Sequence, residues 1–195
     1  NMAMSAADYA YELTNNVDAV DYSSSTYSVL ANIGDVAVTV GATTLLAHTA
    51  IDGLYATDAI YQIENVIGGS SNDILVGSSY ANTLVGSAGD DTIWGGEGID
   101  ALYGDGPVST SGGSDNDVFF LDLNDALVDG GRGYDTLYTR YVNTDLTNVN
   151  NRVVLSNIEA VDLSANASGV GNTLVLSASK VLAMTDSNHK LHIEG

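Results

Sequence analysis

The sequence predicts an all-β fold with a minor helix, in which a parallel β-roll packs with flanking β-strands in one domain. Three observations lead to this prediction: a nine-residue repeat, short alternating apolar runs on both sides of it, and a large excess of acidic residues. The chain has 195 residues with 25 Asp or Glu, five Lys or Arg and a net charge of −20. Hydrophobic residues make up 45% of it, so a packed core is expected.

The repeat begins at Gly68. Read in nines, it runs GGSSNDILV, GSSYANTLV, GSAGDDTIW, GGEGIDALY and then GDG, and after an insertion at residues 104–111 it resumes as GGSDNDVFF and GGRGYDTLY. Glycine occupies the first place of each block, Asp or Asn the sixth, and an apolar residue the eighth. The glycines favour a tight loop and the last three residues a short strand, so two blocks make one turn of a roll.

The segments on either side of the repeat show strand patterns. Alternating apolar runs occur in both, and Ser177 is a good capping residue for a short helix at residues 178–184. We therefore predict one domain, residues 1–195, with these parts: a β-rich N-terminal part (1–67), the roll (68–138) with its inserted loop (104–111), and a β-rich C-terminal part (139–195) with the helix.

The spacing of the aspartates indicates a cation between the turns. Residues 18 apart stack about 4.8 Å from one another, and carboxylates such as those of Asp73 and Asp91 would repel by about 3 to 4 kcal/mol at an effective dielectric near 20. Calcium takes about six to eight oxygen ligands, whereas zinc prefers His or Cys, which the repeat lacks. We expect several Ca²⁺ ions, with the ligands Asp73, Asn82, Asp90, Asp91, Asp100, Asp105, Asp115, Asp117 and Asp135. Ordinary turn residues on an acidic surface, the alternative, would not require a fixed period.

The charge distribution argues against several classes of partner. Residues 1–131 contain 19 acidic residues and no Lys or Arg, so their field repels nucleic acid and anionic membranes. Membrane insertion is not expected, because no apolar run approaches roughly 20 residues. We also expect no enzyme, since the three histidines form no metalloprotease motif and no G-x-S-x-G motif occurs.

The blocks resemble the nonapeptide of repeats-in-toxin (RTX) proteins, G-G-x-G-x-D-x-U-x, which GGEGIDALY and GGRGYDTLY match at every defined position. GSSYANTLV lacks the second and fourth glycines and the aspartate, so a weaker calcium face is expected at Asn82. IENVIGGSSNDILVG, LSNIEAVDLS and NTLVLSASKVLAM resemble segments of large bacterial RTX adhesins. The resemblance implies secretion to the bacterial cell surface, folding in extracellular calcium and a place in a larger multidomain chain. It also implies a ligand-binding module, of the peptide-binding more than the carbohydrate-binding kind.

These observations leave three functions open. The chain could be a calcium-dependent adhesion module for a peptide or protein on another cell's surface, a glycan-binding module, or a purely structural scaffold for folding and export. The insertion favours binding, because loops on rigid frameworks concentrate binding residues. A calcium ion with an open coordination position could accept a peptide's terminal carboxylate or vicinal sugar hydroxyls there. The expected ligand-binding residues are Tyr103, Asp105, Gly106, Pro107, Ser109 and Asp115.

Overall fold

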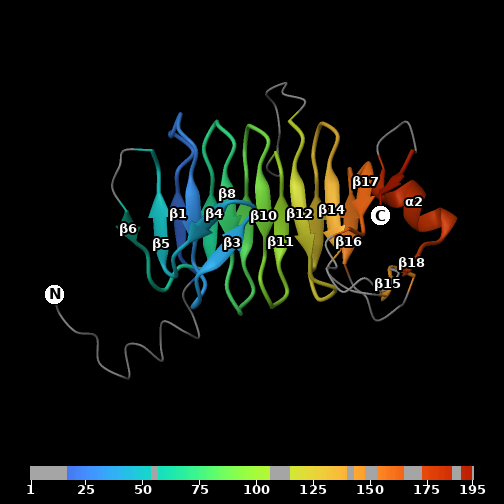
Figure 1. Cartoon of the computed structure of the whole chain (residues 1–195), viewed down its shortest axis with the longest axis horizontal. Helices are drawn as coiled ribbons and strands as arrows, with labels where there is room; N and C mark the ends of the chain where they lie inside the picture. The colour runs from blue at the N-terminus through green and yellow to red at the C-terminus, as the bar shows by residue number, and fades with distance from the viewer. Residues whose placement is uncertain are drawn as a thin grey trace.

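The computed structural model shows an elongated roll in which most strands belong to two sheets (Figure 1). It describes residues 17–53, 57–105, 115–139, 143–147, 153–164, 173–185 and 190–194. Sheet A contains, in spatial order, β1 (Ala19–Asp21), β7 (Asn65–Ile67), β9 (Thr83–Val85), β11 (Ala101–Tyr103), β13 (Leu127–Asp129) and β16 (Val154–Ser156). Sheet B contains β19 (His192–Glu194), β17 (Ala160–Asp162), β14 (Thr136–Thr139), β12 (Val118–Leu121), β10 (Thr92–Trp94), β8 (Ile74–Val76), β2 (Leu30–Asn32), β5 (Thr49–Ile51) and β6 (Asp58–Ala59).

The chain alternates between the two sheets, so that two consecutive strands make one level of the roll. All pairings in sheet A are parallel, as are those in sheet B from β2 to β19. Within the repeat, Ile74 pairs with Thr92, 18 residues later. At the insertion Thr92 pairs with Val118, 26 residues later, so this level holds eight additional residues. The predicted all-β fold with a parallel β-roll is confirmed.

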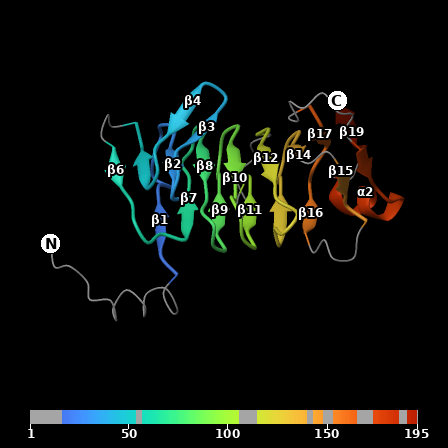
Figure 2. The same cartoon turned by 60° about the horizontal axis from the view of Figure 1, so that its bottom comes forward.

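The stacking continues beyond the glycine-rich repeat in both directions. Strands β1 and β2 form the level before β7 and β8, and strands β16 and β17 follow β13 and β14. At the N-terminal end, β5 and β6 extend sheet B in antiparallel fashion, and β3 (Val38–Val40) and β4 (Thr43–Leu45) form a separate hairpin. This hairpin stands out from the roll beside β2 and β8 (Figure 2).

The core lies between the two sheets and is built from the eighth place of each block. Leu75, Leu84, Ile93 and Leu102 are fully buried there, and each such burial stabilises the fold by about 1.5 to 3 kcal/mol. Neighbouring levels continue the same two rows of buried side chains with Val66, Phe119, Val128, Leu137, Leu155 and Val161. One apolar residue per strand is therefore enough to fill a thin, continuous core.

The C-terminal part contains the predicted helix, α2 (Ala178–Met184), and a small sheet of β15 (Asn143–Asp145) and β18 (Thr173–Val175). Ser177 is the N-cap: its hydroxyl accepts a hydrogen bond from the Lys180 N–H at 3.1 Å. Met184 is fully buried, and α2 packs against β16, the last strand of sheet A. Within the described ranges, no helix has the length and apolar character needed to cross a membrane.

Candidate metal centre

Two rows of turns connect the sheets, along opposite long sides of the roll (Figure 1). We call the turns that lead from sheet A to sheet B the first edge and those that lead from B to A the second edge. The sixth place of a block ends each turn, so residues of this place stack along an edge. On the first edge they are Asp73, Asp91, Asp117 and Asp135, and on the second edge Asn82 and Asp100.

The aspartates of the first edge form a hydrogen-bonded ladder. Oδ1 of Asp91 accepts from the Asp73 N–H at 2.7 Å, and Oδ1 of Asp117 accepts from the Asp91 N–H at 2.8 Å. Asp135 accepts from the Asp117 N–H in the same way, at 2.8 Å. Each carboxylate thus receives a backbone donor from the preceding level, which offsets part of the repulsion expected between stacked carboxylates.

The second carboxylate oxygen is satisfied in Asp73, where it accepts from the Gly69 N–H at 2.6 Å, but not in the other three aspartates of this edge. Oδ2 of Asp91, Asp117 and Asp135 is buried, and no hydrogen-bond donor reaches it among the described residues. A Cβ atom at Gly86 would collide with Asp91 Oδ2 and with the carbonyl oxygen of Gly104, one level further on. The first-place glycine is therefore required for space, and oxygens of two consecutive levels converge beside it.

Burial changes the acidity of these groups. Removal from water raises the pKa of Asp91 to about 9, of Asp135 to about 8 and of Asp117 to about 7, and neighbouring carboxylates add to each shift. Without a cation, Asp91 and Asp135 would therefore keep their protons at neutral pH. A cation that replaces those protons would relieve the unsatisfied oxygens at the same time.

The oxygen atoms available as metal ligands fit calcium. They are buried carboxylate oxygens and backbone carbonyl oxygens, the hard ligands that Ca²⁺ takes, with no His or Cys among them. Nowhere in the described part of the chain do three or more His, Cys, Asp or Glu side chains form a complete metal site. The carbonyl oxygen of Gly104 and Oδ2 of Asp91 lie beside the same glycine, so backbone carbonyls are among the available ligands.

The second edge differs at its sixth-place residues. Asn82 Oδ1 accepts from the Ser78 N–H at 2.7 Å, and its Nδ2 donates to the Glu64 carbonyl at 2.8 Å. One level on, Asp100 Oδ1 accepts from the Asn82 N–H at 2.7 Å, while Asp100 Oδ2 is buried without a hydrogen-bond partner. Asp100 meets the carboxyl group of Asp125, and burial raises the pKa of Asp100 to about 6 and that of Asp125 to about 8.

The remaining predicted metal ligands lie nearer to solvent. Asp90 is exposed, and its Oδ1 accepts from the Asn116 N–H at 2.7 Å. This bond joins two neighbouring levels on the outside of the first edge. Asp105 Oδ2 accepts from the Arg132 N–H at 2.6 Å. The charges of Asp105 and Asp115 both raise the pKa of Asp117, after burial as the main cause, so these three carboxyl groups interact electrostatically next to the insertion.

Of the predicted ligand-binding residues, Asp105 and Asp115 belong to this group of carboxylates. Tyr103 lies in β11 on sheet A, beside Val85 and Asp129 of the neighbouring strands, and is half-buried. Gly106, Pro107 and Ser109 lie outside the described residues, so the structure neither supports nor opposes their assignment.

The sequence did not indicate three further acidic residues, of which two, Glu64 and Glu159, occupy positions equivalent to the ladder aspartates. Glu64 Oε2 accepts from the Asp18 N–H at 2.8 Å, and Glu159 Oε2 accepts from the Asp135 N–H at 3.0 Å, as in the aspartate ladder. Both stand in an I-E-x-V segment whose valine fills the core position, and this recurrence is the signal that could have found them. The fully buried Asp125 lies one place earlier in its level than the period requires, since Ala126 pairs with Asp100.

The comparison with protein families agrees with this geometry. Residues 67–106 match the RTX calcium-binding nonapeptide repeat, in four copies. A search among curated proteins finds no match. Proteins with these repeats are typically secreted, and the repeat is in general not enzymatic. Residues 67–106 of this chain are therefore RTX nonapeptide repeats, which bind Ca²⁺ in multiple copies.

Proposed function

We propose that this chain is a calcium-dependent adhesion module of a secreted RTX adhesin, which binds a peptide or protein on another cell's surface. The observation that carries the proposal is the carboxyl group of Asp117, which lies where the regular period is interrupted and is acted on by the charges of Asp105 and Asp115. Oδ2 of Asp117 is buried and lacks a hydrogen-bond partner. A cation at this oxygen would satisfy it, and the additional residues of this level supply more chain for a ligand to contact than a regular turn has.

The chain itself holds these carboxylates in place. Asp117 Oδ1 is fixed by the Asp91 N–H, and Asp105 Oδ2 by the Arg132 N–H at 2.6 Å. Calcium, when bound, supplies the positive charge that a ligand carboxylate needs on a surface that otherwise repels it. A free peptide C-terminus suits such a position, because it brings two oxygens and one negative charge.

Two other functions compete with this proposal. Vicinal sugar hydroxyls would suit the same position, and the resemblance to RTX adhesins, more than the local chemistry, favours a peptide. A folding and export scaffold needs only the regular repeats. Such a scaffold gains nothing from the eight additional residues between β11 and β12, whereas a binding loop does.

The test is a binding screen of the calcium-loaded chain against short peptides with free or amidated C-termini, with every positive repeated in excess chelator. We expect binding that requires both calcium and the free carboxylate. Asp105→Asn should weaken it, whereas the matched change Asp58→Asn, at an exposed position on β6, should not. If no peptide binds but a glycan array gives binding, the carbohydrate alternative is supported. If neither peptides nor glycans bind, the function as a folding and export scaffold is supported.

A further inference from the structure

A groove lies between the β3–β4 hairpin, the outer face of sheet B and the turns of the second edge, on the opposite side of the roll from the first edge. Its volume is about 1110 Å³. The floor contains Val76 and Trp94, and the wall contains Val36 and Val38. A smaller hollow of about 420 Å³ continues it between β3 and the rings of Trp94 and Phe120. The RTX repeat explains none of these side chains, because they point outward from the roll or belong to the hairpin.

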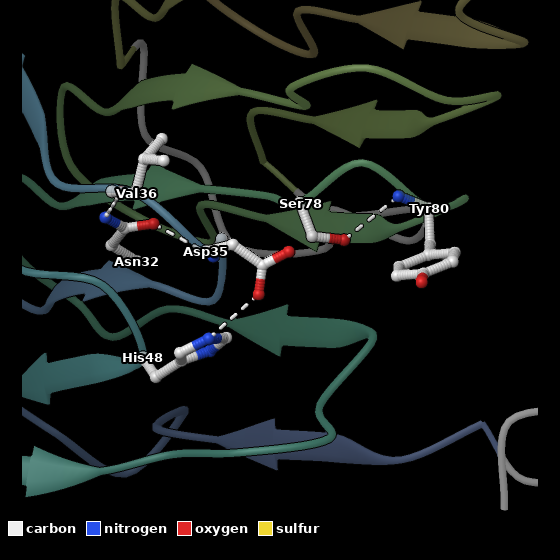
Figure 3. Close-up of polar contacts among 7 residues, drawn as sticks. Asn32, Asp35, Val36, His48, Ser78 and Tyr80 are labelled. Carbon is white, nitrogen blue, oxygen red and sulfur yellow. Dashed lines mark hydrogen bonds and ion pairs between the residues drawn. The ribbon is translucent and has the colours of Figure 1, made fainter. Parts of the chain in front are cut away.

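The hairpin that forms the wall is held firmly at its base (Figure 3). Asn32, a fully buried residue of β2, donates through Nδ2 to the carbonyls of Val36 at 2.9 Å and Leu45 at 3.2 Å. These two carbonyls lie just before β3 and at the end of β4, so one side chain joins both arms to the roll. Leu45 is buried as well. The groove is therefore a permanent feature of the folded chain rather than a gap beside a loose loop.

One edge of the hairpin is available for pairing with another strand. Among the described strands, β3 pairs only with β4, and the hairpin residues that line the smaller hollow belong to β3 and the two residues before it, not to β4. Val40 pairs with Thr43 across a two-residue turn, so the backbone groups of Thr39 point away from β4. The hydroxyls of Thr39 and Thr44 lie 3.0 Å apart, as expected for such a pair. An extended chain in the groove would find a free N–H and C=O there.

The charge of the groove favours extended peptides that carry basic side chains. Asp35, Glu97 and Asp122 line it, and no Lys or Arg does. The side chain of Asp35 is 75% exposed although its Oδ1 lies 3.0 Å from His48 Nε2 (Figure 3). Glu97 is exposed as well. Trp94 adds an aromatic face, which attracts cations, and no Lys or Arg precedes Arg132 in the sequence. Acidic and neutral ligands would gain nothing from this arrangement of charges.

We infer that the groove between the β3–β4 hairpin and Trp94 binds an extended, basic peptide segment of a partner protein. The backbone of the segment adds to the free edge of β3, its aliphatic side chains contact Val36, Val38 and Trp94, and its Lys or Arg side chains reach Asp35 and Glu97. This site is independent of the calcium position proposed above, and it requires no peptide terminus.

Trp94, the single tryptophan of the chain, reports directly on the groove. The probe is a short peptide of alternating Arg and Val, acetylated and amidated so that it has no terminal carboxylate, titrated into the calcium-saturated chain. We expect a saturable change in Trp94 fluorescence that weakens as salt is added. Asp35→Asn with Glu97→Gln should weaken binding by roughly 3- to 10-fold, the scale of losing two exposed charge pairs. The matched pair Asp58→Asn with Glu194→Gln, both exposed and outside the groove, should leave it unchanged.

Several results would overturn the inference. They are an absent Trp94 response, equal binding of an alternating Glu and Val peptide, an equal loss in the control pair, or a response to neutral oligosaccharides without one to the basic peptide. N-methylation of alternate residues of the probe should abolish binding, and unchanged binding would exclude pairing with β3. If free-carboxylate peptides bind while the capped basic peptide does not, this inference fails and the proposed calcium-dependent adhesion stands.

Discussion

At the sixth place of the repeat, Asp91 on the first edge and Asn82 on the second edge occupy equivalent positions. Both use one oxygen for a backbone donor: Asp91 accepts from Asp73 at 2.7 Å, and Asn82 accepts from Ser78 at 2.7 Å. Their other terminal atoms differ. Nδ2 of Asn82 donates to a backbone carbonyl, whereas Oδ2 of Asp91 is buried without a partner. At Asn82 the protein itself satisfies both terminal atoms, as it satisfies both oxygens of Asp73, whereas at Asp91 one oxygen is left for a cation.

The largest expected effect follows from the unsatisfied oxygens of Asp91, Asp117 and Asp135. Removing calcium with excess chelator at about pH 7.5 should unfold the roll, because these buried groups must then hold a proton or an uncompensated charge. Circular dichroism would show the loss, and calcium but not magnesium should reverse it. If the spectrum and the melting temperature stayed the same in chelator, hydrogen bonds without calcium would be enough to stabilise both edges.

The pH dependence of the calcium-free chain should be the next largest effect. Burial raises the pKa of Asp91 to about 9 and of Asp135 to about 8, from an unfolded value of 3.8, so the folded chain binds more protons than the unfolded chain. Stability in chelator should therefore be highest below about pH 4 and fall as the pH rises toward about 9. With calcium present, acid should weaken the fold instead, because protons compete for the same oxygens. Urea midpoints measured across this range with and without calcium would give both slopes, and equal slopes would contradict the assignment.

The same Gly→Ala change can be made at the first place of a block on each edge, so its effect on stability and on calcium affinity can be compared between the edges. A Cβ at Gly86 would meet Asp91 Oδ2 and a carbonyl oxygen, and a Cβ at Gly77 would meet Asn82 Oδ1 and a carbonyl oxygen. Each Gly→Ala change should lower the free energy of unfolding by about 1 to 3 kcal/mol through overpacking. Only Gly86→Ala should also lower calcium affinity, as measured by calorimetry. An equal loss of affinity in Gly77→Ala would place calcium on both sides alike.

Exchanging the two side chains should have the smallest effect. Asp91→Asn removes a charged ligand, so it should stabilise the calcium-free chain and raise the calcium concentration needed for folding by roughly tenfold. Asn82→Asp should destabilise the calcium-free chain, because it adds an unpaired buried carboxylate. Calcium titrations followed by circular dichroism would measure both midpoints. Identical midpoints for wild type and Asp91→Asn would remove Asp91 from the ligand set.

Much of this architecture could be predicted from the nine-residue period. Leu75, Leu84, Ile93 and Leu102 line the core because a fixed period brings the eighth place to the same face at every level. The helix at Ala178–Met184 was also predictable, since its cap and helix formers are local signals.

The outer levels were not predictable in the same way. Ala19 pairs with Asn65 and Leu30 with Ile74, across 46 and 44 residues that include the hairpin, so no constant spacing marks them. Glu64 and Glu159 take the place of aspartate there without a glycine five residues earlier to mark a block.

The position of the groove depends on tertiary packing alone. Asn32 joins the hairpin to β2, and the hairpin then faces Trp94, which is more than fifty residues further along the chain. From the sequence, the tryptophan at the ninth place of its block is predicted only to point outward, because the hairpin that lies beside it is distant in the chain.

The aspartate ladder of the first edge has a direction. The N–H of Asp73 is bound by a carboxylate of the following level, and the same holds for Asp91, Asp117 and finally Asp135, whose acceptor is Glu159. Glu159 therefore closes the row: without its carboxylate, the last amide of the ladder would be buried without an acceptor, and the level that follows the repeat supplies the end piece that the repeat itself lacks.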